Sequence, residues 1–143
     1  MVKVYIDATK ERYGIIAFTE KEDGTKEYLC IGSKTCEESD IILSALQAFR
    51  FALEYLGAPI RFYRENKATI YTDLTCLLGL PLRYFMKSEK YVGVVTEIFK
   101  LLSAGHTLNL SSIYSSDYNE FSDLAHKLAT GESSPSELID RIK

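Results

Sequence analysis

Tryptophan is absent from this 143-residue chain, and only three prolines and three cysteines are present. The cysteines Cys30, Cys36 and Cys76 form no C-x-x-C pair, and an odd number of thiols cannot all pair within one chain. These absences exclude a disulfide framework and a cysteine-based zinc site. We therefore expect free thiols in a reducing compartment.

Long hydrophobic runs and an excess of positive charge are also missing. No apolar stretch approaches the roughly 20 residues of a membrane-spanning helix, and the N-terminal segment lacks the apolar core of a secretion signal. The net charge of −3 and the pI of about 5.4 argue against a generally basic coat for nucleic acid, although they allow a local basic patch. We expect a cytoplasmic protein without a membrane partner.

The chain is hydrophobic enough to bury a full core, at 46% apolar residues, and its length fits one domain. The spacing of apolar residues alternates between period two and the helical period, which predicts a mixed α/β domain of order βββ-α-β-α-α-β-α. Ser39 is the predicted N-cap of the long helix, and Gly57-Ala58-Pro59 its predicted end. The predicted strands are 2–7, 13–18, 27–31, 68–72 and 107–114, and the predicted helices are 37–56, 74–84, 91–102, 119–130 and a short one after Ser134.

An aspartate stands at the end of two predicted strands: Asp7 is the last residue of strand 2–7, and Asp73 directly follows strand 68–72. Function in an open α/β sheet collects at strand ends. Two neighbouring carboxylates repel each other unless a cation lies between them, and Mg²⁺ and Mn²⁺ prefer such oxygen ligands. Aspartate is also a common turn-former, so spacing alone leaves a structural role open.

Three segments resemble the ribonuclease H family, and the resemblance extends to about Thr130. VYIDAT looks like the first strand of that family and is similar to the form found in reverse-transcribing viruses and elements. TIYTDLT looks like the strand that carries a later carboxylate, and YNEFSDLAHKLA is similar to the Asn-Glu-x-x-Asp segment, here Asn119, Glu120 and Asp123.

The resemblance implies a fold and a site. The fold would be α/β, with a ribonuclease H-like mixed five-stranded sheet of three antiparallel strands followed by parallel strands, flanked by helices. Residues 1–131 would form this domain and residues 132–143 a short C-terminal helix. Asp7, Asp73 and Asp123 would be catalytic residues that hold two Mg²⁺ or Mn²⁺ ions, and Asp7 would bridge them.

One expected ligand is absent. ALQAFRFAL resembles the helix segment that begins with the catalytic glutamate of the family, but position 45 is alanine. The second metal is therefore expected to bind weakly. Glu38 or Asp40 would replace the glutamate only if the register slipped, which breaks the apolar matches. The sequence does not distinguish a natural loss at Ala45 from an engineered one.

The histidines and one basic cluster are weaker candidates for functional residues. His106 and His126 are interpreted as surface or structural histidines. Arg83, Lys87 and Lys90 form a basic cluster that either contacts nucleic acid or is a solvated helix junction, and we favour the junction.

The leading hypothesis is a metal-dependent endonuclease that cleaves the RNA strand of an RNA·DNA hybrid, weakened or inactivated by Ala45. Its partner would be that hybrid or a related nucleic acid, as part of a larger replication or reverse-transcription machinery. The alternative is a non-catalytic ribonuclease H-like domain that binds nucleic acid or protein. A resolvase- or transposase-like nuclease that acts on DNA is a third, weaker option.

Overall fold

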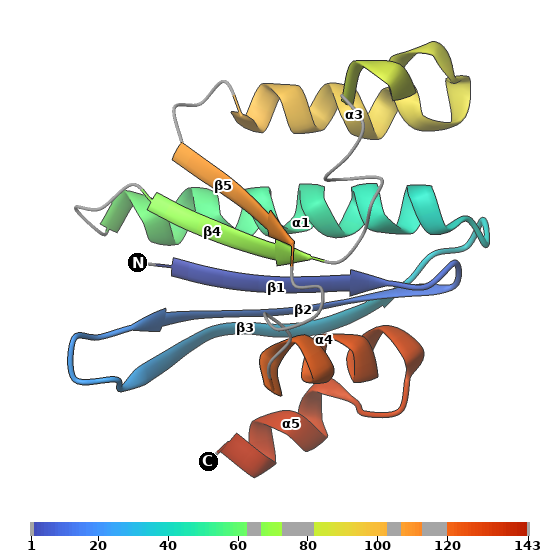
Figure 1. The fold of residues 1–143 in the computed structure, drawn as a ribbon. Helices are drawn as coiled ribbons and strands as arrows, with labels where there is room; N and C mark the ends of the chain where they lie inside the picture. Colours follow the sequence, from blue (N-terminus) through green and yellow to red (C-terminus); the bar gives the residue numbers. More distant parts are fainter. Residues whose placement is uncertain (1, 63–66, 73–81, 103–106, 113–119, 143) are drawn as a thin grey trace.

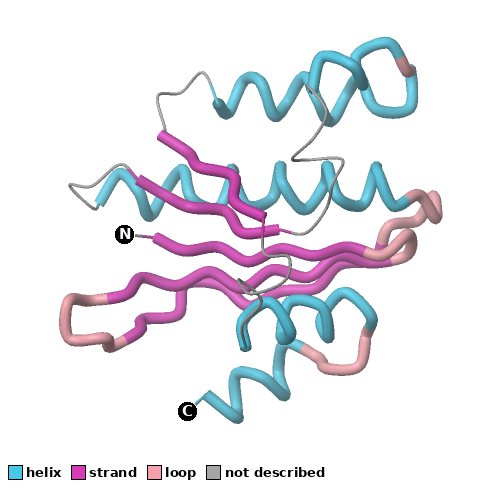
Figure 2. Tube along the Cα trace, viewed as in Figure 1, coloured by secondary structure: helices cyan, strands magenta, loops and turns pink. Residues whose placement is uncertain are grey.

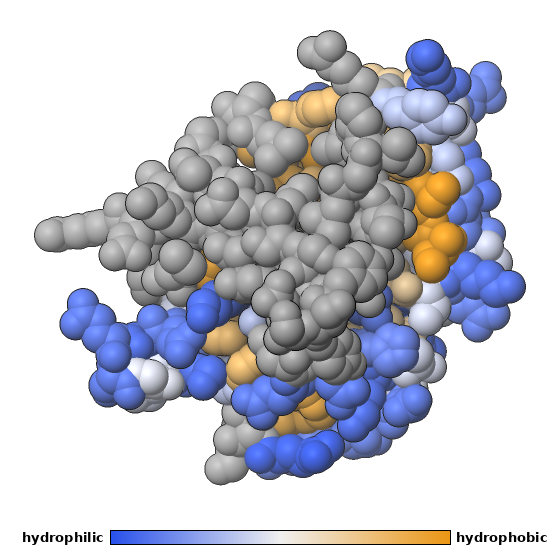
Figure 3. Space-filling view, viewed as in Figure 1, coloured by the Kyte–Doolittle hydropathy of each residue, from blue (hydrophilic) through white to orange (hydrophobic). Residues whose placement is uncertain are grey.

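The computed structural model describes residues 2–62, 67–72, 82–102, 107–112 and 120–142. Figures 1 and 2 show one sheet with helices on both of its faces. Hydrophilic side chains cover most of the described surface in the view of Figure 3, with smaller hydrophobic areas between them. No helix in the described ranges has the length and apolar character to cross a bilayer.

The sheet has five strands in the order β3-β2-β1-β4-β5. The first three strands pair antiparallel, whereas β1 pairs with β4 and β4 with β5 in parallel. The predicted α/β class and the antiparallel opening are confirmed. The strands are β1 (Val2–Ala8), β2 (Arg12–Glu20), β3 (Lys26–Thr35), β4 (Lys67–Thr72) and β5 (Thr107–Ser112).

The turn between β2 and β3 follows its Asp-Gly signal. Gly24 has a φ of 87°, a conformation that side chains with a Cβ rarely adopt. The carboxylate of Asp23 accepts a hydrogen bond from the Thr25 amide at 2.9 Å, and the Lys21 amide donates to the Thr25 carbonyl at 2.9 Å. β2 and β3 are both longer than predicted, because pairing continues past their apolar centres into polar residues.

Alternation along β1 divides the core into two layers. Val4, Ile6 and Ala8 belong to the cluster that packs under α1 (Ile41–Phe62) and α3 (Glu89–Leu102). Tyr5 belongs to a second cluster on the opposite face, with side chains of α4 (Glu120–Thr130) and α5 (Pro135–Ile142). Residue Asp7 has the same parity as Tyr5, so its side chain is directed to the α4 face.

Both predicted ends of the long helix are wrong. Ser39 has a φ of 50°, and Asp40 is the N-cap instead, since its Oδ1 accepts from the amides of Ile42 at 2.9 Å and Leu43 at 3.1 Å. At the other end, α1 continues through Gly57 and Pro59 to Phe62. A proline removes one backbone hydrogen bond, and packing context overrides that local preference.

The remaining helices follow the predictions more closely. α3 begins at Glu89, two residues before the predicted start, after the 3₁₀ helix η1 (Leu82–Lys87). α4 ends before Gly131, whose φ is 84°, as predicted. Ser134 Oγ caps α5 by accepting from the Glu137 amide at 3.3 Å. Most of the predicted helix 74–84 lies outside the described residues.

Candidate active site

Asp7 lies at the carboxyl end of β1 and is buried, with 7% of its surface exposed. Its Oδ1 accepts a hydrogen bond from the Ala8 amide at 2.8 Å. Its Oδ2 lies 2.7 Å from Nδ1 of His126 on α4. A carboxylate only accepts hydrogen bonds, so the histidine nitrogen is the donor when Asp7 is ionised. Both oxygens of this buried carboxylate therefore have a polar partner, which offsets the cost of its burial.

Gly14 explains how α4 comes so close to the sheet. It is the register partner of Asp7 on β2. A Cβ at this position would lie 2.6 Å from the carbonyl oxygen of Ala125, 2.6 Å from Cβ of Leu128 and 2.9 Å from the nitrogen of Ala129. The backbone of α4 thus rests directly on Gly14. This close approach positions the polar edge of α4 beside Asp7.

Two hydroxyl groups hold the last turn of α4 in the same place. Thr9 Oγ1 lies 3.2 Å from the carbonyl oxygen of Ala129, and Ser33 Oγ donates to the carbonyl of Leu128 at 2.9 Å. The last carbonyls of a helix have no partner within the helix, so these side chains satisfy them. Asp7 and Thr9 of the Asp-Ala-Thr motif thus both contact α4.

Asp123 lies in the first turn of α4, three residues before His126. Residues three apart share one helix face, so Asp123 is on the edge of α4 that reaches Asp7. Its Oδ2 forms an ion pair with Nζ of Lys127 at 3.2 Å, and 44% of its side chain is exposed. The structure places two of the three predicted carboxylates on neighbouring elements.

Asp73 lies outside the described residues. β4 ends at Thr72, directly before it. β4 runs parallel to β1, and Tyr71 is the register partner of Tyr5, two residues before Asp7. The strand that leads to Asp73 is therefore the neighbour of the strand that carries Asp7.

Ala45 is completely buried on the face of α1 that packs against the sheet. Ala48, Phe49 and Ala52 share that face, as the helical spacing predicts. Glutamate is a good helix former, so helix propensity alone would allow it at position 45. The position has no exposed surface, so the cost of burying a carboxylate outweighs propensity in the metal-free protein.

Asp40 has a different role from that of a replacement ligand. Its Oδ2 accepts a hydrogen bond from the Tyr91 hydroxyl at 2.6 Å and forms an ion pair with Lys90 at 2.6 Å. Burial disfavours ionisation of Asp40, but the hydrogen bonds from Lys90, Tyr91 and the Leu43 amide outweigh it and lower the pKa of the carboxyl to about 2. Asp40 therefore joins α1 to α3, and Lys90 of the basic cluster belongs to this junction.

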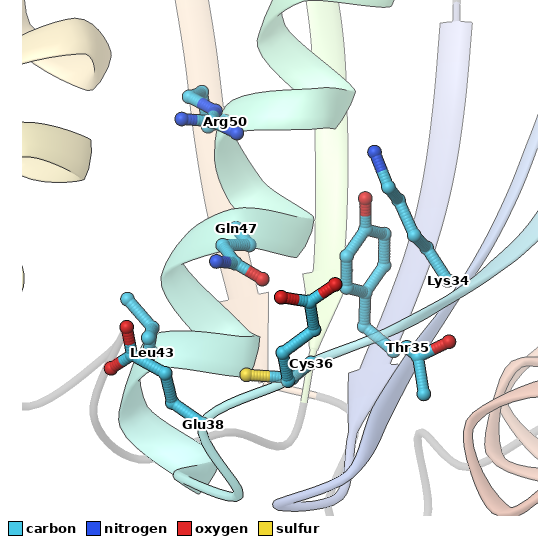
Figure 4. A pocket seen from close by; sticks show the side chains of 9 residues that line it. Lys34, Thr35, Cys36, Glu38, Leu43, Gln47 and Arg50 are labelled. Atoms are coloured by element: carbon cyan, nitrogen blue, oxygen red, sulfur yellow. The ribbon is translucent and has the colours of Figure 1, made fainter.

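Glu38 lines a hollow of about 220 Å³ on the α1 side of the sheet. Figure 4 shows Gln47 and Arg50 on α1 across from Lys34 and Thr35 at the end of β3. Two glutamates, a lysine and an arginine line the hollow, so its charges balance. Neither Asp7 nor α4 contributes to its lining, and this hollow is therefore separate from the candidate site.

His126 was interpreted as a surface or structural histidine. Its side chain is 52% exposed, in line with that interpretation, and its contact with the buried Asp7 was not predicted. The spacing from Asp123 was the available signal, since residues 123 and 126 share a helix face. His106 lies outside the described residues.

The donors of this site suit a hard divalent cation, because Asp7 and Asp123 offer carboxylate oxygens. Within the described ranges, no group of three or more His, Cys, Asp or Glu side chains is arranged to hold a metal ion. The described part supplies one carboxylate–imidazole pair and a second carboxylate on the same helix face. Any further ligand would have to come from a residue such as Asp73. Cys30 and Cys36 are free thiols, as expected, and Cys76 lies outside the described residues.

No family model and no curated protein sequence matches this chain. Solved structures do match its fold. A prototype foamy virus protease-reverse transcriptase is similar over 92% of this chain and 20% of its own, with 18% identity and a TM-score of 0.69. A foamy viral protease-reverse transcriptase in complex with an RNA/DNA hybrid is similar over 91% of this chain and 19% of its own, with 13% identity and a TM-score of 0.63.

A bacterial domain matches over almost its whole length. The N-terminal RNase H domain of rv2228c from Mycobacterium tuberculosis, solved as a fusion with maltose binding protein, is similar over 92% of this chain and 96% of its own. The identity is 12% and the TM-score 0.59. The resemblance stated from the sequence is confirmed at the level of the fold. The chain has a ribonuclease H-like fold.

Proposed function

We propose that this chain is a metal-dependent ribonuclease H-type endonuclease that cleaves the RNA strand of RNA·DNA hybrids. The observation that carries the proposal is the buried Asp7 at the end of β1, directed toward the helix that carries Asp123. The sheet order β3-β2-β1-β4-β5, with its antiparallel and parallel halves, is consistent with a complete ribonuclease H-like sheet.

Asp7, Asp73 and Asp123 would hold Mg²⁺ or Mn²⁺ in this function. A bound divalent ion would supply an activated water and stabilise the leaving oxygen of the phosphodiester. The parallel register of β1 with β4 supports the inclusion of Asp73, because β4 ends directly before it beside the strand of Asp7. The second ion would be held weakly, because Ala45 offers no ligand.

The residues around Asp7 would hold this carboxylate in an orientation suited to metal binding. Gly14 allows α4 to approach, and Thr9 and Ser33 fix the end of that helix. Asp7 therefore has a fixed orientation before any ion binds, and pre-organised ligands lose less entropy on binding. The hybrid would lie over the carboxyl end of β1, next to the half-exposed side chains of Asp123 and His126 on α4.

The substrate and the assembly are the less direct parts of the proposal. One foamy viral neighbour is described in complex with an RNA/DNA hybrid, and this chain spans about a fifth of that protein. We propose by analogy that this chain acts on a hybrid and works within a larger replication or reverse-transcription machinery, inside the cell.

A non-catalytic ribonuclease H-like domain that binds nucleic acid or protein is the second candidate. One observation favours it: Ala45 is fully buried within a continuous apolar cluster, so the core has closed over the position of the expected glutamate. A binding domain needs the sheet and helices but not the carboxylates.

An end-labelled RNA·DNA hybrid distinguishes these candidates. The parent, Asp7→Asn and Ala45→Glu proteins are compared in millimolar Mn²⁺ and Mg²⁺. The nuclease proposal expects slow cleavage by the parent, none by Asp7→Asn, and cleavage faster by orders of magnitude with Ala45→Glu. If the parent and Ala45→Glu bind metal and hybrid but cut nothing, the binding domain is the better account. Asp123→Asn serves as a second loss-of-ligand control.

A further inference from the structure

The hollow between the end of β3 and α1 is lined by polar groups that are withdrawn from water. Tyr13 is one of them, and it is only 4% exposed. Arg50 is another, and its Nε is buried without a hydrogen-bond partner among the described residues. Its ion pair with Glu54 Oε1 measures 3.9 Å, which is too long for a hydrogen bond. Buried polar atoms normally have a partner, so an unsatisfied donor at the wall of a hollow indicates a position for a ligand.

The charges of this hollow are separated between its two ends. Figure 4 shows Arg50 and the ammonium group of Lys34 toward one end and Glu38 toward the other, with Gln47 between them. Burial raises the pKa of Tyr13, and the nearby charge of Arg50 opposes this shift, so the phenol belongs to the cationic end. A hollow with a cationic and an anionic end fits a ligand of the opposite polarity.

From this arrangement we infer that the hollow binds a small zwitterion, a molecule with a carboxylate at one end and an ammonium group at the other. The carboxylate lies at Arg50 and Tyr13, and the ammonium group lies at Glu38. The volume of about 220 Å³ equals that of about seven water molecules at ~30 Å³ each, so an amino acid with a similar number of non-hydrogen atoms fills it. The inference goes beyond the proposed function and does not depend on it, since neither Asp7 nor α4 lines the hollow.

The two glutamates of the lining argue against a nucleic-acid phosphate as the occupant. Glu37 and Glu38 repel a phosphate, which would have only Lys34 and Arg50 to attract it. A zwitterion pairs with both ends, and the guanidinium fork matches a carboxylate in a bidentate arrangement. Lys34, Glu37 and Glu38 are exposed, and exposed ion pairs contribute little free energy. We therefore expect dissociation constants in the millimolar range.

The test uses γ-aminobutyrate as the probe, with butyrate and butylammonium as matched ligands that each carry one of its two charges. Each is titrated into ¹⁵N-labelled protein, and nuclear magnetic resonance follows the backbone amides of residues 34–38 and 47. Arg50→Gln and Tyr13→Phe remove donors from the cationic end, and Glu38→Gln removes a charge from the anionic end. Lys100→Gln is the control, because this lysine lies on α3 with 71% of its side chain exposed and does not line the hollow. Circular dichroism checks that every variant is folded.

We expect saturable shifts of these amides with γ-aminobutyrate, and affinities about tenfold weaker for butyrate and for butylammonium. Arg50→Gln should weaken γ-aminobutyrate binding about tenfold and Tyr13→Phe about fivefold, whereas Lys100→Gln leaves it unchanged. Glu38→Gln should weaken binding of γ-aminobutyrate but not of butyrate. Shifts that do not saturate would mean that water alone fills the hollow, and equal affinity for butyrate would mean a site for anions; either result overturns the inference. An RNA·DNA hybrid that shifts the same amides and displaces γ-aminobutyrate would assign the hollow to nucleic acid and overturn it as well.

Discussion

Gly14→Ala tests whether the contact between α4 and β2 holds the candidate site together. Gly14 does not adopt a positive φ, so its backbone conformation is available to alanine. The new Cβ would lie 2.6 Å from the Ala125 carbonyl oxygen and 2.6 Å from the Leu128 Cβ. Favourable separations between carbon atoms are about 3.5–4.0 Å, so α4 would have to retreat by roughly 1 Å.

The expected cost is that of overpacking a core, about 1–3 kcal/mol of the free energy of unfolding. For a chain of this length, such a loss lowers the melting temperature by roughly 3–10 °C. The retreat also takes His126 away from Asp7, since both contacts depend on the same helix. The variant should therefore lose stability and change the environment of His126 together.

Urea unfolding followed by circular dichroism measures the stability, and the ¹⁵N chemical shifts of the His126 ring report on its contact. Gly93→Ala is the matched control, because nothing lies within 4 Å of a Cβ there and Gly93 is inside α3. That control should be stabilised by roughly 0.5–1 kcal/mol. A Gly14→Ala protein as stable as the parent, with unchanged ring shifts, would refute the packing of α4 on Gly14.

Three further variants probe other parts of the account. Asp40→Ala should cost about 1 kcal/mol through loss of the helix cap. The pKa of Asp40 is lowered to about 2 in the folded state, so the ionised carboxylate stabilises the fold above its unfolded pKa of about 4, and this stabilisation is lost as the pH falls toward 2. Urea titrations at several pH values should find a smaller loss of stability on the acid side in Asp40→Ala than in the parent. The same pH dependence of stability in both proteins would contradict the junction. Thr9→Val should cost about 1 kcal/mol by removing the hydroxyl near the Ala129 carbonyl, and a neutral result in thermal melts would argue against that tie. Ala45→Glu should lower the free energy of unfolding by about 3 kcal/mol in the absence of metal, and Mn²⁺ should restore this stability. Mn²⁺ should not restore the stability of Ala45→Gln. Equal recovery of the two variants in Mn²⁺ would exclude a metal ligand at this position.

The fold was largely predictable from the sequence because its signals are local. Alternation in β1, the Asp-Gly turn before β3 and Gly131 after α4 each determine a structure within a few residues. The ends of α1 were not predictable in this way. Ser39 and Asp40 are both of the residue types that cap helices, so local preference does not choose between them. Asp40 is distinguished by the contacts of its carboxylate with Tyr91 and Lys90, about 50 residues away, and no local pattern contains those contacts.

The candidate site was predictable in its residues but less so in its contacts. The positions of Asp7 and Asp123 in their sequence motifs identified them as site residues. The alternation of side chains along β1 directs Asp7 to the face of the sheet that α4 covers. The contact between Asp7 and His126 spans 119 residues and depends on the absence of a side chain at Gly14. A sequence shows that a glycine is present but not which backbone approaches it, so this pair became visible only in the folded chain.

A calorimetric titration of Mn²⁺ into the parent protein and Asp7→Asn tests the central claim most directly. Asparagine keeps the acceptor for the Ala8 amide and the size of the side chain but removes the charge, so folding should be retained. We predict saturable Mn²⁺ binding to the parent and none to Asp7→Asn, with both proteins folded by circular dichroism. Equal binding to the two proteins, or no binding to either, would contradict the assignment of Asp7 as the central metal ligand.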